Sequence, residues 1–117
     1  MKTVPVERQL YLIDRFIQSK AKTVTKKPVY TEVSSKRFGR NEMAHLVSYP
    51  NASRPSHYAV VYKNTFYNRN KNQNLAKLKQ VGAHELAHIK YPHTHTKQFV
   101  STARRLGAGK YSNTRSG

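Results

Sequence analysis

The stretch from Leu75 to Leu106 reads LAKLKQVGAHELAHIKYPHTHTKQFVSTARRL, and its pattern decides the fold. Apolar residues recur at helical spacing as far as Ile89, which predicts a helix over residues 75–91. Pro92 ends this helix, because proline lacks a backbone N–H and disfavours the helical conformation in the residue before it. A short loop follows, and residues 96–106 again have the apolar spacing of a helix.

Two histidines and one glutamate in this stretch carry chemistry. His84 and His88 are four residues apart, so a helix places both imidazoles on one face, where they can share a cation. Glu85 lies beside the first of them and is the one acidic residue after Glu42. Zinc lowers the pKa of a bound water towards about 7, so Glu85 could take a proton from that water and pass it to a leaving amine. The plainer interpretation is a helix with two exposed histidines.

A catalytic zinc ion generally has three protein ligands and one open position, so a third ligand is required. His93 and His95 both follow Pro92, and a chain that turns back after the helix could bring either of them to the same ion. On reach alone the two remain alternatives. His45 and His57 lie in or beside predicted strands, and we expect them to be ordinary core or surface histidines.

The rest of the chain predicts one α+β domain. Residues 5–20 have the spacing of an amphipathic helix, and residues 21–27 are a basic linker. Strands are expected where β-branched and aromatic residues gather, and a surface loop where asparagine dominates. The strands are residues 29–33, 43–49 and 58–63, and the loop is 64–74. With 117 residues, a single domain over residues 1–106 and a basic, flexible tail over residues 107–117 are expected.

The charge balance indicates a polyanionic partner. The chain has 22 Lys and Arg residues against 5 Asp and Glu residues, a formal net charge of +17. A charge of this size predicts non-specific binding to nucleic-acid phosphates, and eight tyrosines could add stacking on bases. No helix-turn-helix, zinc-finger or RNA-recognition signature appears, so direct reading of bases is not expected. A solvated basic surface without a dedicated partner is the alternative.

Composition excludes cysteine chemistry and disfavours membrane-spanning and secreted proteins. The chain has no cysteine, which excludes disulfides, thiolate ligands and cysteine nucleophiles. No apolar run approaches the roughly 20 residues of a membrane span, and the first residues do not form a signal peptide. An intracellular protein without a membrane partner is therefore expected, with association with a virion as a further option.

The segment from His84 to Phe99, HELAHIKYPHTHTKQF, resembles the active-site segment of the SprT-like zinc metallopeptidases. This zincin group includes the Spartan proteases of DNA–protein crosslinks, the WLM-domain proteins and the bacterial YgjP-like proteins. Its members have HExxH on a helix, then a loop, then a histidine followed four residues later by an aromatic residue, usually phenylalanine. Here that second element is His95-Thr96-Lys97-Gln98-Phe99, whereas the residue four positions after His93 is a lysine.

The resemblance, which covers residues 29–106, implies a zincin-like α+β fold. Its elements would be an N-terminal helix, a small three-stranded mixed or antiparallel sheet, the HExxH helix and a C-terminal helix. It also implies that His84, His88 and His95 hold one zinc ion and that Glu85 is the general base. Without cysteine the chain cannot build the zinc ribbons of larger members, so a minimal catalytic domain is implied.

Two further roles near the motif stay open. Stabilisation of an oxyanion would fall to the zinc ion and a nearby donor, for which Tyr62, Tyr67 and Tyr91 are candidates. Gly82 either lets the zinc helix pack closely on its neighbours or is a mildly destabilising glycine within a helix.

The function expected is hydrolysis of peptide bonds. A peptidase that acts on proteins bound to nucleic acid would account for both the zinc motif and the positive charge. The alternative from another class is a basic nucleic-acid-binding protein, or a structural component of a virion or nucleoprotein. Its zinc ion would only stabilise a zincin-like fold. A third interpretation is a zinc hydrolase that acts on bonds other than peptide bonds.

Overall fold

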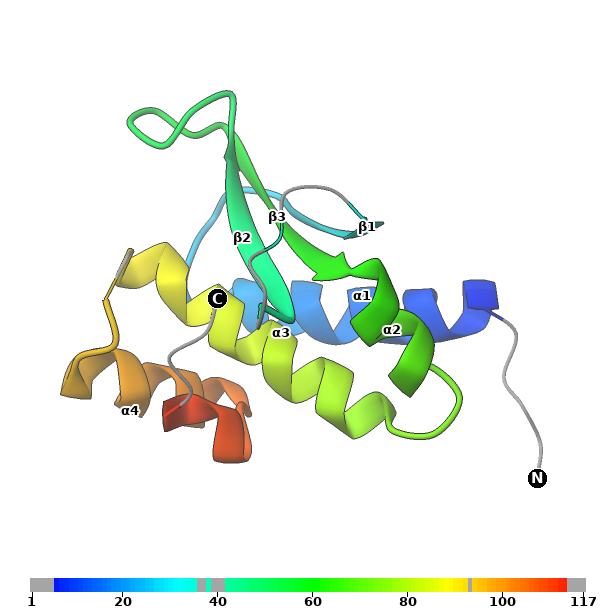
Figure 1. The fold of residues 1–117 in the computed structure, drawn as a ribbon. Coiled ribbons are helices and arrows are strands. Elements are labelled where there is room, and N and C mark those ends of the chain that lie inside the picture. The colour runs from blue at the N-terminus through cyan, green and yellow to red at the C-terminus, as the bar shows by residue number, and fades with distance from the viewer. Residues whose placement is uncertain (1–5, 36–37, 39–41, 93, 114–117) are drawn as a thin grey trace.

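Four α-helices and three strands form the described part of the chain in this computed structural model, which covers residues 6–35, 38, 42–92 and 94–113 (Figure 1). In chain order they are α1 (Val6–Ala21), β1 (Val29–Ser34), β2 (Ala44–Tyr49), β3 (His57–Lys63), α2 (Asn64–Asn70), α3 (Leu75–Lys90) and α4 (Lys97–Leu106), followed by the 3-10 helix η1 (Gly109–Asn113). The α+β class is confirmed. Among the described residues, no helix has both the length and the apolar character needed to cross a membrane.

The three strands form one mixed sheet in the order β1-β3-β2. A short connection, residues 50–56, joins β2 to β3, so these two strands pair antiparallel with Tyr49 opposite His57. Strand β1 pairs with β3 in parallel, with Val29 opposite Tyr58. This order leaves β2 at an edge of the sheet, with no strand of the described chain on its other side.

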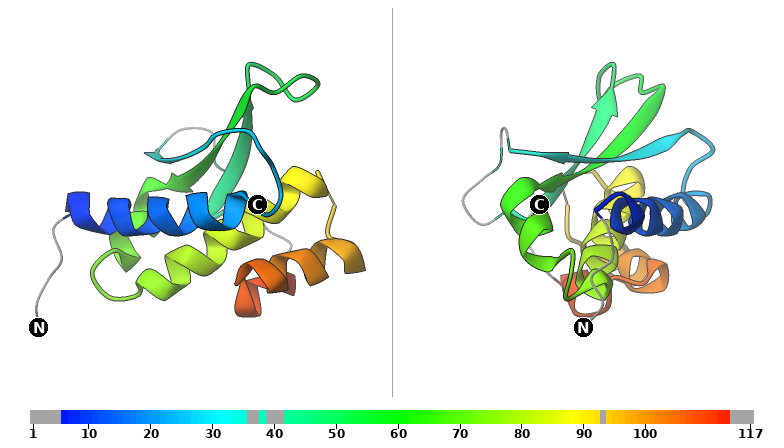
Figure 2. Two further views of the ribbon diagram at one scale, coloured as in Figure 1. Left: turned by 180° about the vertical axis from the view of Figure 1, so that it is seen from behind. Right: turned by 90° about the vertical axis from the view of Figure 1, so that its right-hand side faces the viewer.

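Helices α1 and α3 lie on the same face of the sheet, and α4 packs on α3 (Figures 1 and 2). Alternate residues of β3 point towards these helices, because successive side chains of a strand face opposite sides. The apolar side chains buried between the layers include Ile13, Ile17, Val60, Tyr62, Leu78 and Leu86. The core therefore lies between one face of the sheet and α3, the helix that carries HExxH.

Gly82 allows α3 to approach α1 and β3 closely. A Cβ atom at this position would collide with the side chain of Ile17 and with the hydroxyl of Tyr62. That hydroxyl donates a hydrogen bond to the Leu78 carbonyl at 2.5 Å. The close-packing interpretation of Gly82 is confirmed.

Helix α2 lies where the sequence predicts a polar loop. Its buried side chains include Phe66 and Tyr67, which anchor a single short helix against the core. Asparagines stabilise it locally, since Asn70 Nδ2 donates to the Phe66 carbonyl at 2.8 Å. Asparagine has low helix propensity, so packing of the two aromatic residues outweighs the local preference.

The segment after α4 also differs from the predicted flexible tail. Gly107 adopts a left-handed conformation, with φ of 106°, which ends α4 and turns the chain back. Ala108, Tyr111 and Ser112 are then buried against α3 and α4. Residues 114–117 of the predicted tail lie outside the described residues. The sequence pattern did not indicate these three buried positions, because basic and small residues dominate the segment.

Candidate metal centre

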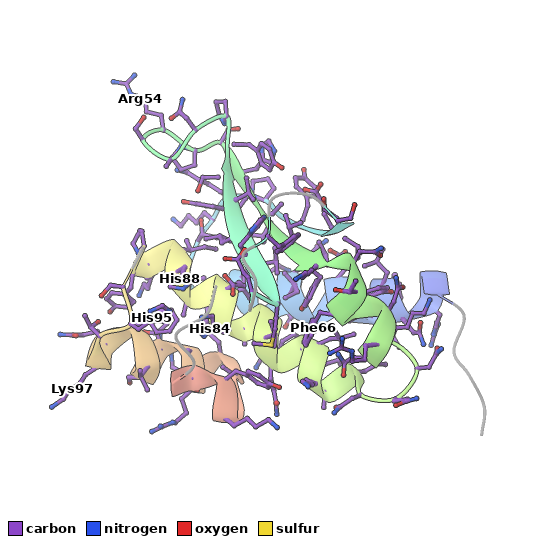
Figure 3. All side chains as sticks on the ribbon, in the orientation of Figure 1. Arg54, Phe66, His84, His88, His95 and Lys97 are labelled. Carbon is purple, nitrogen blue, oxygen red and sulfur yellow. The ribbon has the colours of Figure 1, made fainter. Side chains whose placement is uncertain are left out.

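Three histidines from two neighbouring segments meet beside α3 (Figure 3). His84 and His88 are buried one turn apart on α3, and their ring centroids are 5.2 Å apart. His95 follows the break at Pro92, and its ring lies 5.4 Å from that of His84 and 5.0 Å from that of His88. One ligand atom from each histidine lies within 4.8 Å of the other two, which is close enough to hold a metal ion. His93, the alternative third ligand, lies outside the described residues.

Backbone carbonyls fix the orientation of two of these rings. The Nδ1 atom of His84 lies 2.8 Å from the carbonyl oxygen of Tyr111, and the Nδ1 atom of His88 lies 3.1 Å from that of Tyr91. A carbonyl can only accept, so each Nδ1 carries the proton and donates it. The Nε2 atom of each ring then has the lone pair that a cation needs.

Phe99 supports all three imidazoles. Its ring is fully buried, and its centroid lies 4.9 Å from His84, 4.5 Å from His88 and 4.9 Å from His95. The Thr96 side chain caps α4 by accepting a hydrogen bond from the Phe99 backbone N–H. The start of α4 therefore sets the position of the aromatic ring against which the histidines pack.

Glu85 lies next to the histidines on the side of β2. One carboxylate oxygen, Oε2, is 3.9 Å from His84 Nε2. The other, Oε1, is buried without a hydrogen-bond partner among the described residues. Burial raises the pKa of Glu85 well above 4.5, the nearby charge of Glu42 raises it further, and an interaction with the Leu46 backbone N–H opposes both effects.

A cleft of about 650 Å³ gives access to this group of side chains. Its walls are the edge of β2 and the β2–β3 connection on one side, represented by Leu46 and Pro55, and the end of α3 on the other. Glu85, His88 and His95 line it. The glutamate and two of the histidines therefore share a space that can admit another molecule.

The donor set fits zinc. Imidazole nitrogens are among its preferred ligands, and three leave one position of a tetrahedron open. Three atoms no more than 4.8 Å apart have a common centre at most about 2.8 Å from each, against a zinc–nitrogen bond of about 2.0–2.1 Å. Each nitrogen must therefore move by less than about 1 Å to reach the bond length of a zinc ion at that centre.

The tyrosines considered as oxyanion donors do not line the cleft. Tyr62 is fully buried, and its hydroxyl is engaged with Leu78. Its pKa is raised, first by burial and then by the charge of Glu85, so the phenol stays protonated. Tyr67 is buried in α2, and Tyr91 serves the site through its carbonyl. The cleft-lining tyrosine of the described chain is Tyr58, which sequence reasoning did not single out.

Glu42 and His45 also line the cleft, although His45 was expected to be an ordinary histidine. The His45 Nδ1 atom lies 3.1 Å from Glu42 Oε1, and the His45 ring stacks on Phe38. His57 stacks on Tyr49 and has Ser56 Oγ 3.1 Å from its Nδ1 atom, as expected for a satisfied surface histidine. The three-residue spacing of Glu42 and His45 was the sequence signal that could have predicted their pairing.

The sequence offered no signal for the carbonyls of Tyr91 and Tyr111, which orient His88 and His84. Every residue has a backbone carbonyl, so residue type does not indicate which carbonyl accepts a hydrogen bond.

Comparison of the chain with protein-family models, curated proteins and solved structures gave no match. What the centre can do chemically therefore follows from its own side chains.

Proposed function

We propose that this protein is a zinc-dependent metallopeptidase of the SprT-like kind that acts on proteins bound to nucleic acid. The observation that carries the proposal is the meeting of three histidine ligand atoms within 4.8 Å, with the Glu85 carboxylate 3.9 Å from His84, at an open cleft. The net charge of +17 supports substrates held on a polyanion.

In this proposal His84, His88 and His95 hold the zinc ion. When bound, zinc acts as a Lewis acid that polarises a carbonyl group and makes water more acidic. Glu85 accepts the proton of the attacking water and delivers it to the amine that leaves. Its place beside His84 and on the wall of the cleft supports this role, since a general base must lie within reach of the proton that it takes.

The edge strand β2 offers a way to hold the substrate. Leu46, Val47 and Ser48 line the cleft along the side of β2 that has no described strand beside it. An extended peptide can add to such an edge through main-chain hydrogen bonds, whatever its sequence. Its carbonyl groups would then run along the cleft past Glu85.

The test is the variant Glu85→Gln, measured for both zinc content and proteolysis. The wild type should bind about one zinc ion per chain and cleave an unfolded protein such as casein, and a chelator should stop cleavage reversibly. Glu85→Gln should keep the zinc ion and lose cleavage by about 100-fold or more. Glu32→Gln, the same change at an exposed position of β1, is the control and should cleave normally. Full cleavage by Glu85→Gln contradicts the proposal.

The alternative is a metal ion that serves only stability. It is favoured by the way the three histidines join α3 to the segment that begins α4, so that a bound ion would fasten two helices together. In that case the zinc-loaded wild type cleaves nothing, while chelation lowers the melting temperature. Cleavage by the wild type that depends on Glu85 excludes this alternative.

A further inference from the structure

The face of the sheet turned away from α1 and α3, here called the outer face, carries a set of aromatic side chains. Strand alternation places Tyr30 of β1, His45 and Tyr49 of β2, and His57 of β3 on this face, opposite in direction to the buried Val60 and Tyr62. In the views of Figure 2 both helices lie against the other face. The outer face is thus distinct from the histidine cluster on α3, although His45, at its edge, also lines the cleft.

Three of these rings form a row across the whole sheet. Tyr49 stacks on His57, with centroids 4.9 Å apart and planes inclined by 15°. Tyr30 meets His57 edge-on, at 5.5 Å and 78°. The row therefore takes one ring from each of β2, β3 and β1, and Tyr30 at its end is 51% exposed.

Positive charges flank this aromatic row. Lys26 and Lys27 are exposed, and the next residue, Pro28, accepts a hydrogen bond from the Tyr58 backbone N–H, which places both lysines beside the start of β3. Arg54 is exposed on the β2–β3 connection, which projects beyond the sheet (Figure 3). None of the three pairs with an acidic side chain within the described chain. Glu32 is the acidic residue that strand alternation places on the outer face.

We propose that the outer face binds single-stranded nucleic acid, with bases stacked on Tyr30 and the aromatic row and phosphates held by Lys26, Lys27 and Arg54. Exposed rings offer a stacking surface to any base, and cations beside them attract the backbone. A single strand is the form that fits, because the bases of a duplex are already stacked on each other. This inference does not depend on the proposed peptidase activity.

A second basic surface lies along α4 and serves as the comparison. Lys97, Arg104 and Arg105 line a groove of about 590 Å³ there. No aromatic side chain other than the ligand His95 lines that groove among the described residues. It can attract phosphate but offers no comparable surface for stacking, so the outer face is favoured for a strand with unpaired bases.

The experiment measures fluorescence anisotropy of a fluorescein-labelled oligothymidylate with the full chain. Tyr30→Ala should weaken binding by about tenfold, as expected for the loss of one stacked base. Tyr30→Phe keeps the ring and should keep the affinity, which separates stacking from any general effect on folding. Tyr11→Ala is the matched control, because Tyr11 is 50% exposed on α1 and already accepts a hydrogen bond from Arg15. It should bind as the wild type does.

Charge and strand form provide the second set of measurements. Glu32→Gln should tighten binding by removing repulsion at the outer face, whereas Asp14→Asn on α1 should have a smaller effect. An abasic strand of the same length should bind more weakly and should not distinguish Tyr30→Ala from the wild type. The proposal is overturned if duplex binds as tightly as the single strand, or if Tyr30→Ala and Tyr11→Ala behave alike. It is also overturned if removal of the three α4 cations abolishes binding while Tyr30→Ala leaves it unchanged.

Discussion

Glu85 is a carboxyl group held in the interior beside imidazoles, and in the metal-free protein its ionised form is poorly stabilised. Burial and the charge of Glu42 both disfavour that form, and the Leu46 backbone N–H compensates only in part. A cation held by the neighbouring histidines would act in the opposite direction, since an opposite charge nearby favours the ionised carboxylate. We therefore expect the ionised Glu85 carboxylate to destabilise the folded protein most at neutral pH when no metal ion is bound.

This leads to a prediction for the chelated protein. The folded-state pKa of Glu85 is raised, so between the ordinary value near 4.5 and the raised value the folded state keeps a proton that the unfolded state releases. Stability therefore falls as pH rises through this window. Glu85→Gln cannot show this loss. Urea unfolding of both proteins over a pH series should give a stability difference that grows with pH in favour of the variant. Parallel pH curves for the two proteins would contradict the prediction.

Gly82 gives a prediction about packing. Alanine favours a helix by up to about 1 kcal/mol over glycine, but the added Cβ collides with Ile17 and the Tyr62 hydroxyl. Gly82→Ala should therefore destabilise the fold by about 1–3 kcal/mol in denaturant unfolding. In a Tyr62→Phe background, which lacks the hydroxyl, the same change should cost less. An equal cost in both backgrounds would show that the hydroxyl is not the obstacle.

At the scale of elements, α4 contributes one residue, Phe99, to the packing of the three histidines. Phe99 contacts all three histidine rings, so its removal leaves a cavity behind them. We expect Phe99→Ala to lower stability by about 3–5 kcal/mol and to weaken zinc affinity. Phe99→Leu is the milder version that should still fold and still lose affinity.

The control for that prediction is Phe66→Ala in α2, on a helix away from the histidines (Figure 3). It should destabilise the fold while zinc affinity, measured by competition with a chromophoric chelator, stays near that of the wild type. Equal losses of zinc affinity in the two variants would mean that Phe99 acts only through global stability.

How far sequence predicts these elements depends on where their information lies. Helix α3 was predictable because its apolar spacing and its two histidines share one period, and Pro92 marks its end. Helix α2 was not predictable, because its asparagines favour turns and Phe66 and Tyr67 alone are too few to define the apolar face of a helix. Reach alone left His93 and His95 as alternatives for the third histidine, and the resemblance to the SprT-like segment favoured His95, which the structure places beside His84 and His88. The orientation of His84 was not predictable, because a carbonyl of η1 provides it.

At the scale of the whole molecule, positive charge is the dominant property. The net charge is +17, and the Cα atoms have a radius of gyration of 13.3 Å. In the described chain no lysine or arginine pairs with an acidic side chain, since the ion pairs found there both involve histidine. Repulsion among like charges is thus opposed by few attractive pairs.

We therefore expect the melting temperature to rise with sodium chloride between low ionic strength and about 0.15 M, where the Debye length shortens to about 8 Å. Calorimetry of the chelated protein measures this. A neutral solute at matched osmolarity is the control and should not reproduce the steep rise at low concentration. A melting temperature that falls with salt would mean that attractive pairs outweigh the repulsion.

The hydrogen bond from His84 to the Tyr111 carbonyl joins residues 27 positions apart. A ribosome releases a chain from its N-terminus onward, so both histidines of α3 emerge well before the acceptor that orients the first of them. During that interval the segment that carries HExxH lacks its finished arrangement. The orientation of the His84 ring therefore depends on η1 packing on α3, so a growing chain can fix this ring only after residue 111 has emerged and folded back.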